Sequence, residues 1–216
     1  GFTKSRNIKQ LVYYLKYLII IREWFRESQN VIPEYINESI YYLGSGYAFF
    51  WKNISTDIFF NGNYQSQNID FDQYLKRFGY TFKNDVNELG GYVILNNKKI
   101  VLVMDVGSSP NKNFSEDYQY GALSFEILSN QKKLITNAGY FPDKRNKLNK
   151  LSKSTALHST LVIEDFSSCT SKRSGKNILV DKGLKVSKKN IIYEKNYWKI
   201  SGLHDGYLQK FGTIHE

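Results

Sequence analysis

The chain has 216 residues, of which 41% are hydrophobic and 23% charged, and its formal net charge is +10. This composition excludes a disordered chain and favours one or two globular domains. A single cysteine, Cys169, excludes an internal disulfide, and the apolar run 11–21 is too short to span a bilayer.

The positive charge is concentrated in two stretches. Residues 141–153 have a net charge of +4 and residues 171–189 a net charge of +6, which accounts for the whole excess. A concentrated positive field favours an anionic partner, whether acidic polysaccharide, nucleic acid or anionic lipid. The alternative is that both stretches are lysine-rich loops that only face solvent.

The first 43 residues predict two helices. Asn7 is a capping residue for a helix that continues to about Gln29, and its apolar positions recur at helical spacing. Pro33 suits the first turn of a second helix, and Gly44 and Gly46 are predicted to end it. Such a hairpin cannot bury both of its faces alone, so it is expected to pack on the following domain.

From residue 47 onward the sequence predicts short strands separated by turn residues and loops, the loops including 63–72 and 107–117. About ten such strands without intervening helices indicate a large antiparallel β-sandwich. The predicted fold class is therefore mainly β, with an N-terminal helical hairpin before the sandwich. The strands are expected at 48–51, 58–60, 90–95, 100–105, 123–128, 134–135, 160–163, 178–180, 184–186, 191–193, 197–200 and 207–211.

Few residues suggest chemistry by their spacing alone. No phosphate-binding loop and no paired His or Cys metal motif is present. His158 lies among small hydroxyl residues and is either a metal ligand or site-wall residue, or a hydrogen-bonded structural histidine. His204 and Asp205 are adjacent, so they point to different faces of a strand and do not form an automatic catalytic pair. Cys169 has no adjacent His or acid and is not expected to be a nucleophile.

Several segments together resemble a known family. GALSFE at 121–126, LITNAG at 134–139 and STALHSTLV at 154–162 are similar to the C-terminal domain of heparinase II/III-like proteins. The resemblance implies that residues 1–45 are the tail of an α/α toroid and residues 46–216 a C-terminally truncated β-sandwich. The start without Met and the end just after an apparent strand agree with a fragment of a longer protein.

The same resemblance implies a polysaccharide lyase that cleaves uronate-containing chains by β-elimination. That reaction needs a neutralised uronate carboxylate, a base for the C5 proton and a proton donor for the leaving oxygen. The neutralising Asn and a catalytic Tyr are expected in the toroid, so this fragment alone is expected to be inactive. The alternative is a catalytically inactive carbohydrate-binding sandwich of the same family.

The chain departs from the family at its catalytic and metal positions. The family's His-x-His pair aligns with Asp117 and Gln119, its zinc-binding Asp aligns with Asn137, and only His158 keeps its metal-ligand counterpart. One imidazole beside two amides is a poor zinc site, so no zinc or other cofactor is expected.

Because the catalytic His is missing, three neighbouring residues are candidates for the catalytic base: Asp117, Tyr118 and Tyr120. The acidic polysaccharide is expected to contact six residues: Lys144, Arg145, Lys147, Lys153, His158 and His204. Nucleic acid is not expected as a partner because the chain lacks an RNA-recognition signature. The oligomeric state, the polysaccharide and the compartment (bacterial periplasm or cytoplasm) stay open.

Overall fold

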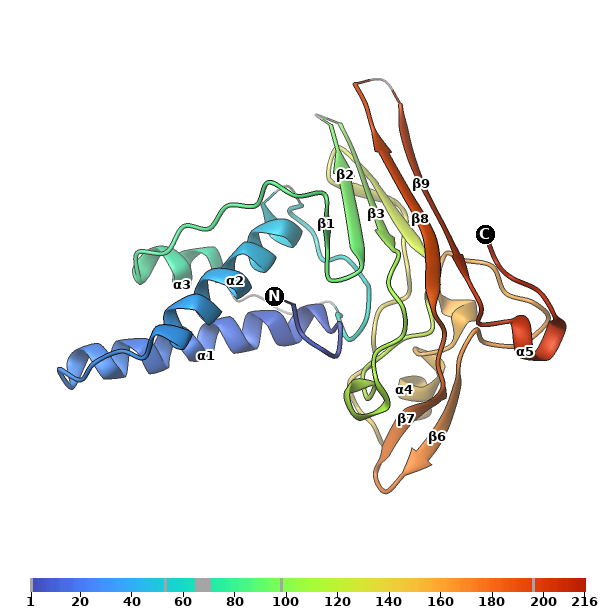
Figure 1. Cartoon of the computed structure of the whole chain (residues 1–216), viewed down its shortest axis with the longest axis horizontal. Coiled ribbons are helices and arrows are strands. Elements are labelled where there is room, and N and C mark those ends of the chain that lie inside the picture. Colours follow the sequence, from blue (N-terminus) through green and yellow to red (C-terminus); the bar gives the residue numbers. More distant parts are fainter. Residues whose placement is uncertain (1, 53, 65–70, 98, 196) are drawn as a thin grey trace.

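The structure is a computed structural model that describes residues 2–52, 54–64, 71–97, 99–195 and 197–216. A helical hairpin leads into a five-stranded antiparallel sheet and two further β-hairpins (Figure 1), which confirms the predicted fold class. No helix in these ranges is long and apolar enough to cross a membrane. The helices are α1 (Ile8–Glu27), α2 (Glu34–Trp51), α3 (Phe71–Arg77), α4 (Lys147–Leu151) and α5 (Leu208–Phe211), with short 3-10 turns η1 (Lys112–Phe114) and η2 (Thr155–Leu157).

The hairpin forms as its pattern predicts. The Asn7 side chain accepts hydrogen bonds from the backbone N–H groups of Lys9 and Gln10 and so caps α1. Leu11, Leu15 and Ile19 recur at helical spacing, are fully buried, and share an apolar cluster with the buried face of α2. Burial of each such side chain contributes about 1.5–3 kcal/mol relative to exposure.

Helix α2 does not end at its glycines, and the strand predicted at 48–51 is wrong. The helix continues to Trp51 because Phe49 and Phe50 extend its buried face. Gly44 and Gly46 serve close packing: a Cβ at Gly46 would lie 2.7 Å from the Leu11 side chain. The domain division after residue 45 stays a prediction, and α2 crosses that position.

The central sheet is antiparallel with the order β1-β2-β3-β4-β5. Strand β2 is buried on both faces, which explains its continuous apolar run YVIL. Tyr92 and Ile94 pack towards the helical hairpin, whereas Val93 and Leu95 pack towards the β8–β9 hairpin. The strands are β1 (Glu88–Leu89), β2 (Tyr92–Asn96), β3 (Ile100–Asp105), β4 (Phe125–Ser129), β5 (Lys132–Ile135), β6 (Thr170–Ser174), β7 (Asn177–Lys182), β8 (Val186–Tyr193) and β9 (Trp198–His204).

The β8–β9 hairpin is the second layer of the sandwich and runs beside β3 in Figure 1. Ile191, Trp198 and Ile200 cover the sheet face opposite the helices. An ion pair between Lys189 and Glu88 joins the two layers at their edge. The sheet is therefore enclosed between helices on one side and a β-hairpin on the other.

Four other predicted strands are also wrong. Residues 58–60 have no strand pairing, residues 160–163 form only an isolated bridge at Ile163, and 208–211 form helix α5. Side-chain hydrogen bonds replace strand pairing here: the Thr160 hydroxyl donates to Ala122 O, and the Tyr207 hydroxyl donates to Leu161 O. The strand predicted at 184–186 is not separate, because only Val186 is in a strand and it begins β8. Most of the loop predicted at 63–72 lies outside the described residues, and α3 and β6 were not predicted.

Candidate functional site

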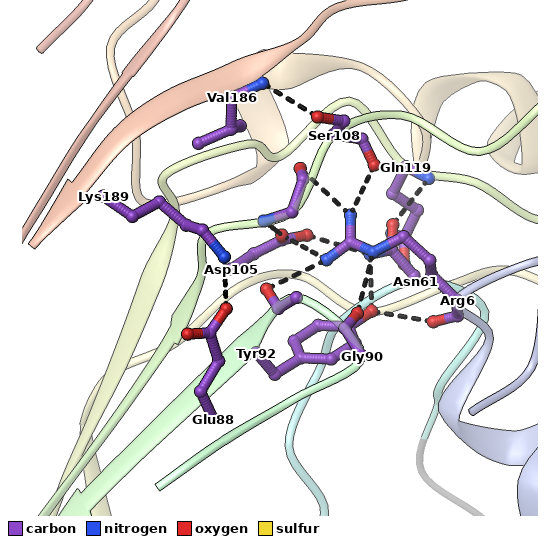
Figure 2. Close-up of polar contacts among 12 residues, drawn as sticks. Arg6, Asn61, Glu88, Gly90, Tyr92, Asp105, Ser108, Gln119, Val186 and Lys189 are labelled. Carbon is purple, nitrogen blue, oxygen red and sulfur yellow. Dashed lines mark hydrogen bonds and ion pairs between the residues drawn. The ribbon is translucent and has the colours of Figure 1, made fainter. Parts of the chain in front are cut away.

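Arg6 connects the start of α1 to the central sheet (Figure 2). Its guanidinium pairs with buried Asp105 and uses all five N–H donors. Burial is the largest single influence and lowers the pKa of Arg6, but the charge and hydrogen bond of Asp105, together with the nearby Tyr92 and Tyr118, raise it by more in total. The remaining acceptors, at 3.1–3.2 Å, are the carbonyl oxygens of Gly90, Gly91, Gly107 and Ser108.

The contacts continue from Asp105 through Asn61 to Gln119. The Asn61 amide donates to Asp105 Oδ2 at 2.9 Å and to the Tyr92 hydroxyl at 2.6 Å. The Tyr92 hydroxyl donates to Arg6 O at 2.7 Å, and the Gln119 backbone N–H donates to Asn61 Oδ1 at 3.1 Å. Burial raises the pKa of Tyr92, so the phenol stays protonated as this donor. We call these five residues the Arg6 network.

The Gln119 side chain links three separate segments of the sandwich. Its amide nitrogen donates to Gly139 O at 3.1 Å and to Ser152 O at 2.7 Å. Its amide oxygen accepts from the Gly62 N–H at 3.3 Å. All polar atoms of this side chain are therefore engaged with the backbone, which makes Gln119 a structural crosslink.

Asp117 lies two residues away in a second polar group, the Asp117 cluster of Asn7, Asp117, Tyr140 and Asn149. Asn7 Nδ2 donates to Asp117 Oδ2 at 3.0 Å, and the Tyr140 hydroxyl donates to Asp117 Oδ1 at 2.9 Å. Asn149 donates to the Tyr140 oxygen at 3.0 Å. Asp117 is half-buried whereas its three partners are buried. Burial and then the Asp117 charge raise the pKa of Tyr140, so this phenol is a stable donor that orients the carboxylate.

Lys153 approaches this cluster from the other side. The side chain is buried, and its ammonium donates to the backbone carbonyls of Glu116 and Ile178. Burial lowers the pKa of Lys153 to about 8, although Asp117 and Glu116 oppose the shift. Lys153 is thus held inside the protein, unlike the other predicted cationic contacts Lys144, Arg145 and Lys147.

The exposed cations lie on the loop that includes α4. Lys144 forms an ion pair with Glu116, the residue before Asp117. Arg145 is almost fully exposed, and Lys147 is exposed at the start of α4. These three side chains are placed where a bound anion can reach them.

Tyr118 and Tyr120 occupy an apolar setting, unlike Asp117. Both rings pack against Cys169, Val180 and the neighbouring apolar side chains. Burial raises the pKa of both tyrosines, and the Tyr118 hydroxyl has no hydrogen-bond partner among the described residues. Of the three candidates for the base, Asp117 alone has a polar and partly exposed setting. Burial also raises the pKa of Cys169 to about 12, which keeps this thiol protonated.

His158 is a buried, neutral imidazole. Burial lowers its pKa to about 4, against a smaller opposing effect of the Ser152 backbone. Its Nε2 has no partner within the described part of the chain, and neither does the side-chain nitrogen of Asn137. The Asn137 oxygen accepts from the Ser159 N–H at 2.9 Å. His158 also forms part of the wall of a cavity of about 590 Å³, together with Leu123, Phe125 and His215.

His204 lies at the end of β9 and is paired with His215, which the sequence did not single out. His204 Nε2 is 2.9 Å from His215 Nδ1, and His204 Nδ1 accepts from the Gly206 N–H at 3.1 Å. Burial, followed by the charge of His215, lowers the pKa of His204 to about 4. The pair pins the last residues of the described chain onto β9, where His204 N–H donates to His215 O at 2.9 Å.

Comparison with known proteins identifies the family. A profile described as Heparinase II/III-like, C-terminal matches residues 86–216. The chain belongs to the heparinase II/III-like C-terminal family. A search of curated proteins found no match.

Two of the solved structures that share this fold are heparinase III and heparan sulfate lyase HepC. Heparinase III is 15% identical with a TM-score of 0.62, over 95% of this chain and 38% of that chain. Heparan sulfate lyase HepC from Pedobacter heparinus is 14% identical with a TM-score of 0.65, over 96% of this chain and 35% of that chain. At such identities the likeness establishes the fold alone, and this chain spans little more than a third of either protein.

The residues at the metal position of the heparinase II/III-like resemblance do not fit a zinc ion. Gln119 is fully engaged with the backbone, and the Asn137 oxygen already accepts from Ser159. His158 is the one strong ligand there, and across the described ranges no group of three His, Cys, Asp or Glu is placed to hold a metal. No step of the chemistry below uses a metal.

Sequence reasoning missed several residues of this site. Arg6, Tyr140, Asn149 and His215 received no role, and Asn7 was noted only as a helix cap. Their partners are far along the chain: Tyr140 is 23 residues from Asp117, and Asn7 is 110 residues from it. The one local hint of a role for Tyr140 was its position directly after Gly139. A tyrosine at that position is equally compatible with an ordinary turn.

Proposed function

We infer that this chain is the sandwich side of a polysaccharide lyase that cleaves a uronate-containing acidic polysaccharide by β-elimination. The Asp117 cluster is the observation that carries this proposal. It places a partly exposed carboxylate between the start of the helical hairpin and the sandwich, beside exposed cations. The family and the neighbours named heparinase III and heparan sulfate lyase support the same reaction class.

Asp117 suits the role of proton acceptor. A carboxylate has about four lone-pair positions, and Asn7 and Tyr140 occupy one on each oxygen. The remaining positions can accept the C5 proton of a bound uronate. Asn7 and Tyr140 are positioning residues, because each fixes the carboxylate and neither needs to touch the sugar.

The other parts of the reaction are divided between this chain and the rest of the enzyme. Lys144, Arg145 and Lys147 are exposed and attract the anionic chain to the site. The group that neutralises the uronate carboxylate and the donor for the leaving oxygen are expected from the toroid. Tyr118 and Tyr120 support the wall behind Asp117 from within the apolar cluster.

The test uses the full-length protein with a panel of uronate polysaccharides, including heparan sulfate and polygalacturonate. Turnover is measured as ultraviolet absorbance of the unsaturated product. Asp117→Asn is expected to reduce turnover by about 100-fold or more, the usual effect of losing a positioned base. The matched control Asp85→Asn, at an exposed carboxylate outside the proposed site, is expected to leave it unchanged. Unchanged turnover in Asp117→Asn would overturn the assignment of the base.

A catalytically silent carbohydrate-binding sandwich is the second candidate. Its support is that Asp117 and Gln119 stand at the positions of the family's His-x-His pair, and that Gln119 is a structural crosslink. Absence of product from every polysaccharide, together with retained binding, would favour this candidate.

A further inference from the structure

The two basic stretches of the sequence meet in space. Lys153 ends the first stretch, and its ammonium donates to Ile178 O in β7. Ile178 is the cross-strand partner of Arg173, which belongs to the second stretch. Figure 1 shows α4 beside β6 and β7, in agreement with this contact. The fold therefore combines charges that are separate along the chain.

Most of the charge at this junction is exposed and not paired. We define the basic surface by its seven exposed cations: Lys144, Arg145, Lys147, Lys150, Lys172, Arg173 and Lys176. Lys144 and Arg145 have acidic partners, but the other five form no ion pair with another described residue. Lys144 also contributes to lowering the pKa of Lys153, since both cations lie close together.

The basic surface starts beside Asp117 and leads away from it. Lys144 pairs with Glu116, directly before Asp117, and the Lys153 ammonium donates to both Glu116 O and Ile178 O, so β7 also lies close to Glu116. The five residues of β6 extend about 16 Å at the usual rise of a strand, so the surface continues well outside the Asp117 cluster.

We propose that the basic surface is a second contact site for the acidic polysaccharide, outside the catalytic cleft, which holds the chain through distributed charge. This rests on the proposed function for the identity of the polyanion. Neither stretch 144–153 nor 170–182 contains an aromatic residue, so neither supplies a ring of its own on which nucleic-acid bases stack. Helix α4 has five residues and is too short to lie in a membrane surface as an amphipathic helix.

The test measures binding, separately from turnover, in the Asp117→Asn form of the full-length protein. The probes are a heparan sulfate tetrasaccharide and a long heparan sulfate fragment, with polygalacturonate fragments of both sizes in parallel. The variant combines Lys150→Gln, Lys172→Gln, Arg173→Gln and Lys176→Gln, and it leaves Lys144, Arg145 and Lys147 intact because these three also serve the catalytic site. Its matched control replaces four exposed lysines in or directly before the β8–β9 hairpin, at equal net charge: Lys185→Gln, Lys188→Gln, Lys195→Gln and Lys199→Gln.

We expect the first variant to bind the long fragments about tenfold to a hundredfold more weakly at low salt, since each exposed charge contributes modestly. Its affinity should also depend less on salt. Tetrasaccharide affinity and the control variant should stay unchanged. Unchanged binding of the long fragment would overturn the proposal, and so would an equal loss for both sizes, which places the charges in the cleft. The polysaccharide assignment would also be overturned if single-stranded RNA or anionic vesicles bound equally tightly through the residues substituted in the first variant. If the parent enzyme yields no unsaturated product, only the proposed reaction fails.

Discussion

The Arg6 network and the basic surface use the same kind of side chain in opposite ways. Arg6 is buried, and all five of its donors have fixed acceptors. Lys172 and Lys176 are exposed and form no ion pair within the described residues. Loss of Arg6 leaves buried acceptors unsatisfied, whereas loss of a surface lysine leaves only solvent in its place. Burial, rather than charge, therefore separates the residues that hold the fold from those available for binding.

The largest expected effect is at Arg6. Arg6→Ala removes one partner of a buried ion pair and strands Asp105, so the free energy of unfolding should fall by about 3–5 kcal/mol. Urea denaturation measures this. Arg145→Ala, at an almost fully exposed arginine, is the matched control and should change stability by less than about 0.5 kcal/mol. Equal effects of the two substitutions would remove the contrast between the two regions.

Gln119 tests whether hydrogen bonds hold the region where the family resemblance places a metal. Gln119→Ala leaves two buried carbonyls and one N–H without their partner, and it should cost about 3 kcal/mol. The melting temperature of the unmodified protein should not change in a chelator such as EDTA. A large loss of melting temperature in the chelator would mean that a bound metal, rather than Gln119, holds these segments together.

Stability should also fall in mild acid because of the buried histidines. Burial holds the folded-state pKa of His158 and His204 near 4, below their ordinary value of 6.5. The unfolded chain therefore binds more protons between these values, so this stability is complete above pH 6.5 and is lost as the pH falls towards 4. For His204, the charge of His215 adds to the lowering and that of Asp205 opposes it.

Urea denaturation at pH 7, 6 and 5 should show a loss of up to about 2 kcal/mol for each of the two histidines by pH 5. In His204→Gln the free energy of unfolding should depend less on pH, whether or not the substitution changes stability at pH 7. An unchanged slope in that variant would assign the acid sensitivity to other groups.

The smallest effect is expected for single exposed lysines. Lys172→Gln alone should leave stability unchanged within about 0.5 kcal/mol, measured in the same urea assay. A large loss would show that the β6–β7 hairpin depends on this charge for folding, which would weaken its assignment as a binding surface.

Local patterns predicted the elements whose contacts are local or whose strands alternate regularly. The Asn7 cap, helix α1 and the strands β2 to β5 follow from them. Prediction failed where tertiary contacts overrule propensity. The end of α2 was misread because glycine usually ends helices, whereas Gly46 here lets Leu11 approach closely. The strand predicted at 207–211 is largely a short helix, and the Leu161 carbonyl is bonded by the Tyr207 hydroxyl instead of by a strand at these residues.

The candidate site shows the same division. The sequence indicated Asp117, Gln119, Asn137 and His158 through the family resemblance, and it located both basic stretches. It did not show that Gln119 is a crosslink, since its acceptor Ser152 is 33 residues away. It also grouped Lys153 with the surface cations, although burial lowers its pKa and fixes its ammonium on backbone carbonyls.

The sequence by itself determined the sandwich class and the confinement of the charge to two stretches, since these follow from composition and from residues near one another in the chain. The family, and the prediction that Asp117 and Gln119 stand at the positions of the His pair, came from the resemblance. The tertiary structure decided which residues act together. It brought Arg6 to Asp105 across 99 residues, Tyr140 to Asp117, and the two basic stretches to each other. These pairings arise from packing between elements that are distant in sequence. A local sequence pattern therefore does not predict which polar groups will contact one another in the folded protein.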